Sequence, residues 1–350
     1  MLYNIHWMDM KIIIFNDRPD YVGGTMYYAR LSAILGMQNI SIETITATRI
    51  TSTIAKLDML LLKYFQISPL SYIRLLMIKK RCADVVFGSN IFLPFKVRKF
   101  FNIKVIAWFP DFQMHDLPEM FTDKKLARRT LFEKRLIFFS DKIVVQNDAD
   151  LKRMLAKVPG KDVQVLKFFH PKSLKKSNQD ITTNQNDYIL VAAQGWRHKR
   201  IDQVIKCYEA SLKKYDLVLI GSTDDPRDKK YSEELNRLIE SSSATYLGFV
   251  DEQKKERLFS NCRAVLNFSL YEGWNSSIEE AISYAKPTIL SDIPVHREQV
   301  PEATFVSNNK TLRDVFSGIV KIKDLQNTDE IIQRRADTVD NFVRELCKKR

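Results

Sequence analysis

Two glutamates eight residues apart, Glu272 and Glu280, are the side chains best placed for chemistry in this 350-residue chain. A strand pattern over residues 264–269 ends in a turn that contains Gly273, and a helix pattern begins near residues 275–277. Glu272 is therefore expected on the loop and Glu280 one turn inside the helix. The unpaired N–H groups and the dipole of a first helical turn can bind a phosphate or diphosphate. Acids on either side of that anion can accept hydrogen bonds from sugar and ribose hydroxyls, which suits a nucleotide sugar.

The stretch from Ser269 to Glu298, SLYEGWNSSIEEAISYAKPTILSDIPVHRE, resembles the E-x7-E element of glycosyltransferase family 4. The match is to members that read EGW-S/N-x-x-VEEA followed by KP-x-x-SDIPVHRE. The resemblance implies a retaining enzyme in which Glu272 contacts the transferred sugar and Glu280 the ribose. It also implies that the diphosphate binds around three backbone amides, those of Asn275, Ser276 and Ser277. The commoner EGFGLP form is absent, which leaves the donor sugar open, and an ordinary helix cap at Asn275 or Ser276 is the alternative interpretation.

A basic cluster follows the first strand pattern of the second half, in the segment AQGWRHKR. It contains four basic side chains, Arg197, His198, Lys199 and Arg200. Three permanent positive charges at a strand end could balance a diphosphate leaving group and the charge that grows as the glycosidic bond breaks. The cluster resembles the basic element of the same family, which implies that Lys199 binds phosphate. Arg197 is the second candidate, although the family's arginine commonly lies farther upstream. A solvated basic loop is the alternative.

Two stretches of the first half add candidates. Gly23 and Gly24 are expected in a loop after the strand pattern at 11–15, where glycines let the backbone approach a ligand closely. A similar Gly-Gly loop faces the donor in family 4, while an ordinary tight connection is the alternative. The segment AWFPDFQMHDLPEMF, residues 107–121, resembles the family's acceptor-side PD-[LF]-QH-x-x-x-PE-x-F run. Its histidine comes one residue late, at His115, which either contacts the donor sugar or acceptor or is a satisfied loop histidine.

Asp148-Ala149-Asp150 spells the D-x-D pattern with which many GT-A transferases hold a divalent metal. Because the pattern follows a strand at 142–146, Asn147 or Asp148 is expected to cap a helix instead. The remaining His, Cys and Asp residues show no metal-ligand spacing, and the cysteines form no C-x-x-C pair. We therefore expect no cofactor and no obligatory metal, with the nucleotide sugar as a substrate.

Short β-branched runs alternate with helical patterns from end to end, which is typical of parallel sheets covered by helices. The strand patterns lie at residues 11–15, 40–46, 84–87, 104–108, 142–146, 163–166, 188–192, 216–220, 245–247, 264–268, 288–290 and 304–306. Helix patterns of the first half lie at residues 25–35, 69–80, 125–139 and 148–155. We expect an α/β protein of GT-B fold, with two Rossmann-like domains whose parallel sheets face each other across a cleft. The expected parts are an N-terminal acceptor-side domain (1–170), a polar linker (171–187), a C-terminal nucleotide-sugar donor domain (188–325) and a C-terminal helix (326–350) that can cross back to the first domain.

The positive charge is concentrated in the first half. Residues 1–165 carry +10 of the net charge of +13, and residues 51–100 hold nine bases and two acids among Leu, Ile, Phe and Tyr. A basic and apolar surface of this kind can lie on anionic lipid, where each base contributes about 1 kcal/mol. A solvated helix face with an apolar inner side explains the same pattern. Residues 1–10 lack the order of a signal peptide and no apolar run is long enough to span a bilayer, so we expect a cytoplasmic protein, peripheral at the inner membrane face where lipid binds.

Together these features predict a retaining hexosyltransferase that moves a sugar from a UDP- or GDP-sugar to a hydroxyl of a lipid-linked or polysaccharide acceptor. The expected setting is the biosynthesis of lipopolysaccharide or another cell-surface glycan. Only the resemblance supplies retention, through an oxocarbenium-like transition state in which the donor phosphate takes the acceptor proton. One alternative is a GT-B nucleotide-sugar epimerase. The other is a non-catalytic basic protein that binds membrane or nucleic acid, whereas no nucleic-acid partner is expected for the transferase.

Overall fold

A computed structural model describes residues 11–16, 22–36, 40–46, 58, 60–61, 69–80, 84–88, 92, 94–170, 187–225 and 227–347. The chain divides into two compact units, one formed by Met1–Pro171 with Arg335–Arg350 and the other by Lys172–Arg334. The predicted linker lies outside the described residues except for Asp187. Much of the basic segment at 51–100 also lies outside them.

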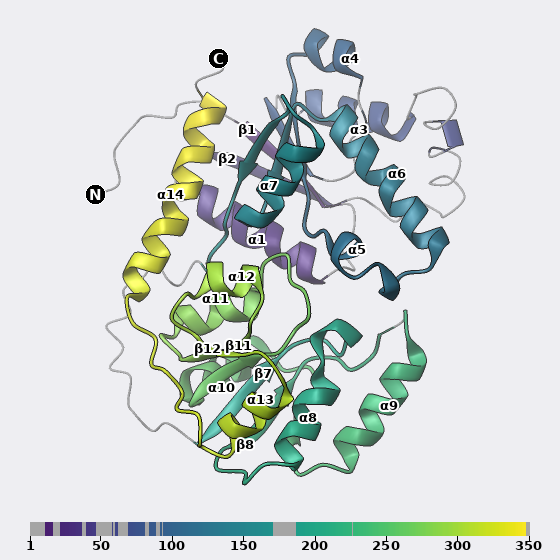
Figure 1. The fold of residues 1–350 in the computed structure, drawn as a ribbon. Coiled ribbons are helices and arrows are strands. Elements are labelled where there is room, and N and C mark those ends of the chain that lie inside the picture. Colours follow the sequence, from purple (N-terminus) through teal and green to yellow (C-terminus); the bar gives the residue numbers. More distant parts are fainter. Residues whose placement is uncertain are drawn as a thin grey trace. The chain divides into compact units, whose positions relative to one another are not determined.

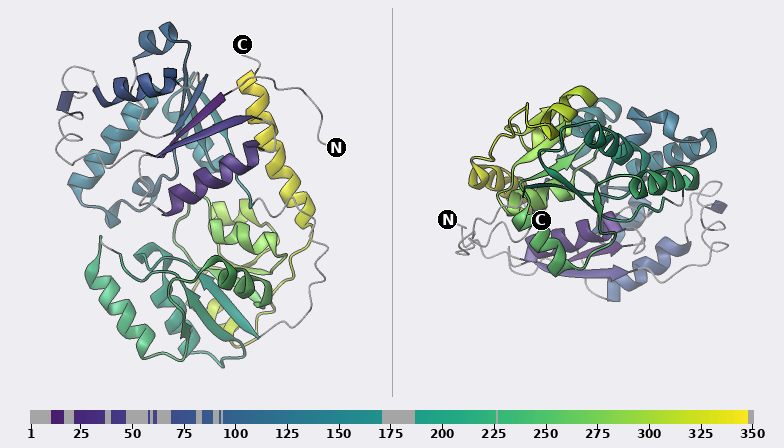
Figure 2. Two further views of the ribbon diagram at one scale, coloured as in Figure 1. Left: turned by 180° about the vertical axis from the view of Figure 1, so that it is seen from behind. Right: turned by 90° about the horizontal axis from the view of Figure 1, so that it is seen from below.

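The first unit is built on a six-stranded parallel sheet with the order β2-β1-β3-β4-β5-β6. The strands are β1 (Lys11–Asn16), β2 (Ser41–Thr46), β3 (Val85–Gly88), β4 (Lys104–Trp108), β5 (Lys142–Val145) and β6 (Asp162–Val165). Ile13 pairs with Val86 and Ile106 with Lys142 across this ladder. Helices cover both faces (Figure 1; Figure 2), and the four inner strands β1, β3, β4 and β5 are accordingly largely buried apolar runs. The edge strands β2 and β6 instead mix polar and apolar residues.

Helix α1 begins earlier than its sequence pattern predicts. The helices of the first unit are α1 (Val22–Gly36), α3 (Pro69–Lys80), α4 (Phe95–Phe100), α5 (Gln113–Asp116), α6 (Asp123–Phe139) and α7 (Asp148–Lys157). Gly23 and Gly24 therefore lie in the first turn of α1, and the expectation that they form a loop is wrong. A helical glycine costs about 1 kcal/mol relative to alanine. Burial of Tyr27, Leu31 and other residues along the same helix offsets that cost.

The second unit contains another six-stranded parallel sheet, with the order β12-β11-β10-β7-β8-β9. Its strands are β7 (Tyr188–Ala192), β8 (Asp216–Ile220), β9 (Thr245–Tyr246), β10 (Ala264–Asn267), β11 (Thr288–Ser291) and β12 (Thr304–Val306). Its helices are α8 (Ile201–Glu209), α9 (Lys229–Glu240), α10 (Glu252–Asn261), α11 (Ser276–Ser283), α12 (Pro294–Gln299) and α13 (Asn309–Phe316).

Strand β7 shows how the core of the second unit is divided. Ile189 and Val191 pack with residues of α8, α9 and α13 on one face of the sheet, while Tyr188 and Leu190 pack with residues of α10 and α11 on the other. Both faces are therefore buried, as in a doubly wound sheet. The predicted α/β architecture of two Rossmann-like domains with parallel sheets is confirmed.

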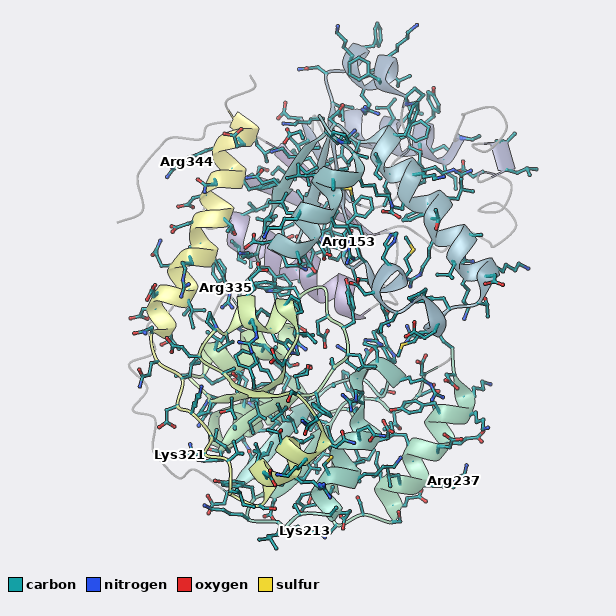
Figure 3. The ribbon with its side chains drawn as sticks, viewed as in Figure 1. Arg153, Lys213, Arg237, Lys321, Arg335 and Arg344 are labelled. Carbon is teal, nitrogen blue, oxygen red and sulfur yellow. The ribbon has the colours of Figure 1, made fainter. Side chains whose placement is uncertain are left out.

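The last helix, α14 (Thr328–Cys347), belongs to the first unit from Arg335 onward. Figure 3 labels Arg335 and Arg344 along it. Phe342 is fully buried and meets the ring of Phe87 on β3 edge-to-face, with 6.2 Å between ring centroids. Of the helices in the described part of the chain, none has the length and apolar character needed to cross a membrane.

Candidate active site

Two loops of the second unit start from neighbouring strands at the carboxyl edge of its sheet. β7 and β10 lie side by side, but the chain continues from β7 to β8 on one side and from β10 to β11 on the other. This reversal is a topological switch point, the place where open parallel sheets bind ligands. The loop after β7 contains residues 193–200, and the loop after β10 contains residues 268–275. The basic and acidic elements predicted from the sequence therefore meet at this edge.

Glu272 is the centre of this arrangement. Its buried carboxylate accepts two hydrogen bonds from the Lys199 ammonium, at 2.6 Å to Oε1 and 2.7 Å to Oε2. Oε1 also accepts from three neutral side chains, Ser269 Oγ (2.6 Å), Asn275 Nδ2 (2.9 Å) and Asn267 Nδ2 (3.2 Å). Charge-assisted hydrogen bonds are the strongest of these. The lysine and the acid that the sequence singled out separately are thus direct partners.

The surroundings of Glu272 keep its carboxyl group ionised. Burial alone would raise the pKa, but Lys199 foremost, with further contributions from nearby histidines, lowers the pKa to about 2. Glu272 is therefore a carboxylate at neutral pH. Lys199 is the permanent cation that balances it.

Two buried histidines belong to the same network. Burial lowers the pKa of His198 to about 3 and that of His296 to about 4, so both imidazoles are neutral at pH 7. Nδ1 of His296 donates to the carbonyl of Ser291 at 2.9 Å, and the Ser291 hydroxyl donates to the carbonyl of Ser269 at 2.6 Å. These bonds connect α12 to the loop that carries Glu272.

Asn275 is the N-cap of α11, as the capping interpretation predicts. Its Oδ1 accepts from the amides of Ser277 (2.9 Å) and Ile278 (3.2 Å), while its Nδ2 donates to Glu272. The buried side chain of Gln299 on α12 clamps the backbone of Asn275, accepting from its N–H at 3.2 Å and donating to its carbonyl at 3.1 Å. The start of α11 is therefore held from both sides, and cap and acid form one hydrogen-bonded unit.

Glu280 lies inside α11, as predicted, and is buried together with its neighbour Glu279. Lys255 on α10 donates to Glu280 at 3.0 Å and to Glu252 at 2.8 Å. Although burial lowers the pKa of Lys255, these two carboxylates raise it by more. Glu279 accepts from Gln299 at 2.9 Å. The second acid of the motif is thus also held by a lysine from another helix.

Arg197 stands apart from the Glu272 network. Its guanidinium donates to Asp228 at 2.8 and 3.0 Å and lies over the ring of Tyr231, 4.7 Å from the centroid. Asp228 caps α9, so Arg197 is bound to that helix start. Of the two predicted phosphate-binding bases, the structure brings only Lys199 to Glu272.

In the first unit, His115 on α5 is bound to a buried acid. Its Nε2 lies 3.1 Å from Oε2 of Glu133 on α6, whose Oε1 accepts from Lys157 of α7 at 2.6 Å. The neighbouring Asp116 accepts from Arg153 at 2.5 Å, a residue labelled in Figure 3 on α7. The His115–Glu133 hydrogen bond and the Arg153–Asp116 ion pair thus fasten the short helix α5 to α6 and α7. Gly23 and Gly24 lie in the same unit, at the start of α1.

The D-x-D stretch forms the first turn of α7, and Asn147 caps that helix, as predicted. Asn147 Oδ1 accepts from the amide of Asp150 at 2.8 Å at the start of α7. Burial is the main cause that raises the pKa of Asp150 to about 6. Within the described ranges, no three His, Cys, Asp or Glu side chains gather as a metal-binding group.

Several residues of the network were missed by reasoning from the sequence: Asn267, Ser269, Lys255, Ser291, His296 and Gln299. The polar pair Asn267 and Ser269 interrupts an otherwise apolar strand end, AVLNFS, and this break in the pattern is a usable signal. Gln299 follows the recognised SDIPVHRE segment directly but contains no pattern of its own. Its partner Asn275 is 24 residues away, and only the folded chain shows the pairing.

Comparison with known proteins points to one class. Residues 173–337 match the family model of glycosyl transferases group 1. Over 158 residues the chain is 27% identical to the O-antigen chain mannosyltransferase RfbU of Salmonella typhimurium, a match that covers 44% of this chain and 43% of RfbU. The chain therefore matches less than half the length of this curated relative.

Solved structures extend the likeness to nearly the whole chain. HepE of Anabaena in complex with UDP and glucose superimposes with a TM-score of 0.68 at 14% identity, over 97% of this chain and 100% of that one. Sucrose-phosphate synthase of Thermosynechococcus elongatus gives a TM-score of 0.70 at 14% identity, over 98% and 100%. The fold is GT-B, two Rossmann-like domains with parallel sheets.

Proposed function

We propose that this protein is a glycosyltransferase that transfers a sugar from a UDP- or GDP-sugar to a hydroxyl of a glycan or lipid-linked acceptor. The match of residues 173–337 to glycosyl transferases group 1 and the likeness to RfbU support the class. The HepE structure, which contains UDP and glucose, supports a nucleotide-sugar donor.

The observation that carries the proposal is the bidentate pair of Lys199 with Glu272 at the switch point. A buried ion pair is costly unless further hydrogen bonds satisfy it, and here three neutral donors do so at Oε1. Oε2 accepts from Lys199 alone among the described residues. That oxygen retains lone pairs for sugar hydroxyls.

The donor is held by three features of the second unit. The Glu272 carboxylate accepts from hydroxyls of the sugar, and Glu280, fixed by Lys255, accepts from the ribose. The diphosphate lies at the start of α11, where it shares the first-turn amides with the Asn275 side chain. Lys199 divides its three N–H donors between Glu272 and the diphosphate. As the glycosidic bond breaks, charge grows on the diphosphate, and Lys199 and the helix start stabilise it more than they stabilise the bound donor.

We further propose that the sugar is transferred with retention, through an oxocarbenium-like transition state in which the donor phosphate accepts the acceptor proton. In the first unit, Gly23, Gly24 and His115 are the residues that we propose to contact the donor sugar or the acceptor. Glu133 takes one nitrogen of His115, so the other is available for such a contact. A lipid-linked or polysaccharide acceptor of a cell-surface glycan fits the likeness to an O-antigen mannosyltransferase.

The test is a thermal-shift screen against a panel of UDP- and GDP-sugars, followed by product analysis with and without acceptors. We expect one nucleotide class to raise the melting temperature and an acceptor-dependent glycoside to form. Conversion of the donor without any acceptor would identify an epimerase instead. Absence of a shift with every nucleotide would reject the donor site.

A further inference from the structure

Two helices of the first unit expose large apolar side chains to solvent. On α4, Phe95 and Phe100 are 63% and 81% exposed, and on α6, Phe138 is 70% exposed. Leu131, on the same α6, is exposed as well. Single exposed apolar residues are ordinary, but a group of them on adjacent elements marks an interaction surface.

A buried arginine makes these side chains part of one surface. Arg98 of α4 donates to the carbonyl of Phe139 at 2.7 Å and, through two nitrogens, to the carboxylate of Asp141 at 2.9 to 3.2 Å. α4 is thereby fastened to the C-terminal end of α6, where Phe138 precedes Phe139 in the chain. On the inner side of α4, Val97 packs against the core cluster of Leu75. The inward anchoring leaves the phenylalanines at both ends of α4 in solvent.

The charges on the same two helices are almost all positive. The exposed charged residues of α4 and α6 are Lys96, Lys99, Lys124, Lys125, Arg128 and Lys134, against the single acid Asp123. Glu133, the other acid of α6, is buried under His115 and Lys157. Exposed bases therefore outnumber exposed acids on these two helices by six to one.

We propose that α4 and α6 form a docking surface for an anionic lipid bilayer, into which Phe95, Phe100 and Phe138 insert while the bases contact lipid headgroups. Aromatic and aliphatic side chains flanked by lysines suit the boundary between headgroups and acyl chains. A single-stranded nucleic acid can use both the bases and the phenylalanine rings but gains nothing from Leu131, which offers no ring for stacking, so the exposed leucine favours lipid. The surface lies partly within the basic segment 51–100 and extends beyond it to α6. It depends on no residue of the donor site.

The experiment is flotation of the full chain with vesicles of equal parts phosphatidylcholine and phosphatidylglycerol at low salt. We expect binding that weakens as salt is added and that is absent with phosphatidylcholine alone. Phe95→Ser with Phe100→Ser should lower the partition coefficient by at least about tenfold. Lys96→Gln with Lys99→Gln should lower it by about twenty-five-fold, since each base contributes about fivefold. The matched control is Leu212→Ser with Ile319→Ser, which replaces side chains of similar exposure (79% and 71%) in the second unit and should change nothing.

Wild-type binding by the folded Phe95→Ser, Phe100→Ser variant would overturn the proposal, as would an equal loss in the control variant. Tighter binding to a single-stranded RNA than to the vesicles in the same buffer would also overturn it and indicate a nucleic-acid surface. Circular dichroism and the melting temperature establish that each variant is folded. Vesicle binding needs no nucleotide, so a protein that does not bind vesicles would not contradict the proposed sugar transfer. The thermal shift that nucleotides produce in the phenylalanine variant tests the donor site separately.

Discussion

Each unit contains a buried glutamate with a lysine at 2.6 Å, and the two are built differently. Glu272 lies on a loop at the carboxyl edge of the second sheet, and its other partners are neutral donors from the same loop and from β10. Glu133 lies in the middle of α6 and joins His115 and Lys157 from two other helices.

The difference supports the proposed assignment of ligand binding to Glu272 and Lys199 rather than to Glu133. Glu133 has each oxygen occupied by a base from a different helix, so its effect is to hold α5, α6 and α7 together. Glu272 has its neutral donors on one oxygen and, among the residues that the structure describes, the lysine alone on the other. Glu272 and Lys199 can therefore still form hydrogen bonds with a substrate. Glu133 instead acts by holding three helices together.

The largest effect is expected at the sheet-edge pair. Lys199→Ala and Glu272→Ala should each lower the rate of sugar transfer by about 10²–10³-fold, because each removes charge stabilisation of the transition state. The measurement is kcat with saturating donor and acceptor. The control is Lys213→Ala, labelled in Figure 3, which breaks an exposed Lys–Glu pair of the same unit. Equal activity of all three variants would show that the Lys199–Glu272 pair contributes no more to sugar transfer than the exposed pair of Lys213 does.

Low pH should lower the free energy of unfolding of the second unit. The pKa values of His198 and His296 lie below the usual value, at about 3 and 4, so the unfolded chain binds more protons than the folded one as the pH falls below about 6.5. We expect the free energy of unfolding to be lower at pH 5 than at pH 7 by on the order of 3 kcal/mol. Glu272, with its pKa of about 2, adds a further loss between about pH 4.5 and pH 2.

Urea unfolding of wild type and His296→Gln at the two pH values separates these contributions. The glutamine variant is less stable throughout but should lose only about half as much stability between pH 7 and pH 5, because one of the two buried imidazoles no longer titrates. A wild-type stability independent of pH over this range would show that the histidines are not held neutral.

Gln299 connects α12 to the start of α11 in the second unit. Gln299→Leu keeps a similar volume but loses the hydrogen bonds to both backbone groups of Asn275. We expect kcat/KM for the donor to fall about tenfold, mainly through KM, because the α11 amides lose their fixed position. Unchanged donor kinetics in a variant with a lowered melting temperature would mean that the clamp serves stability alone.

In the first unit, Glu133→Gln should cost stability rather than nucleotide binding. The amide keeps the shape but loses the charge that pairs with Lys157, whose side chain is about one-third exposed and can rehydrate. We expect a loss of about 1–2 kcal/mol in unfolding free energy. The thermal shift produced by UDP or GDP should match that of wild type, and a reduced shift would show that the two pairs act on the same ligand.

The smallest effect is expected for Arg197→Ala. Its partner Asp228 is partly exposed, and pairs of this kind contribute about 0–1 kcal/mol. Because the guanidinium is engaged at the start of α9, we expect kcat/KM to fall by only about threefold. A loss as large as that of Lys199→Ala would show that Arg197 leaves Asp228 to bind the diphosphate.

Much of the architecture was predictable because it follows from local patterns. Apolar strand runs bounded by polar turns located all twelve strands of the described residues to within a few positions, and the acidic and basic elements were assigned correctly to strand ends. Helix α4 was not predicted, since six residues, FKVRKF, are too few to show a helical period. Its stability comes from Arg98 and from partners some forty residues away in sequence.

The chemistry was predictable only where strand ends impose proximity. Lys199 and Glu272 follow adjacent strands, so topology brings them together. Three pairings depend on how helices pack: Arg197 with Asp228, His115 with Glu133 and Gln299 with Asn275. Tertiary contacts of this kind cannot be predicted from the spacing of residues in the sequence. Even the start of α1 depended on burial further along the helix rather than on its two glycines.

Hydrogen–deuterium exchange with UDP and with GDP tests the location of the donor site most directly. One of the two nucleotides should slow exchange in the segments 194–200 and 270–280, and the protection should be lost in Lys199→Ala. Protection confined to other parts of the chain, with these two segments unchanged under saturating nucleotide, would contradict a donor site at Lys199 and Glu272.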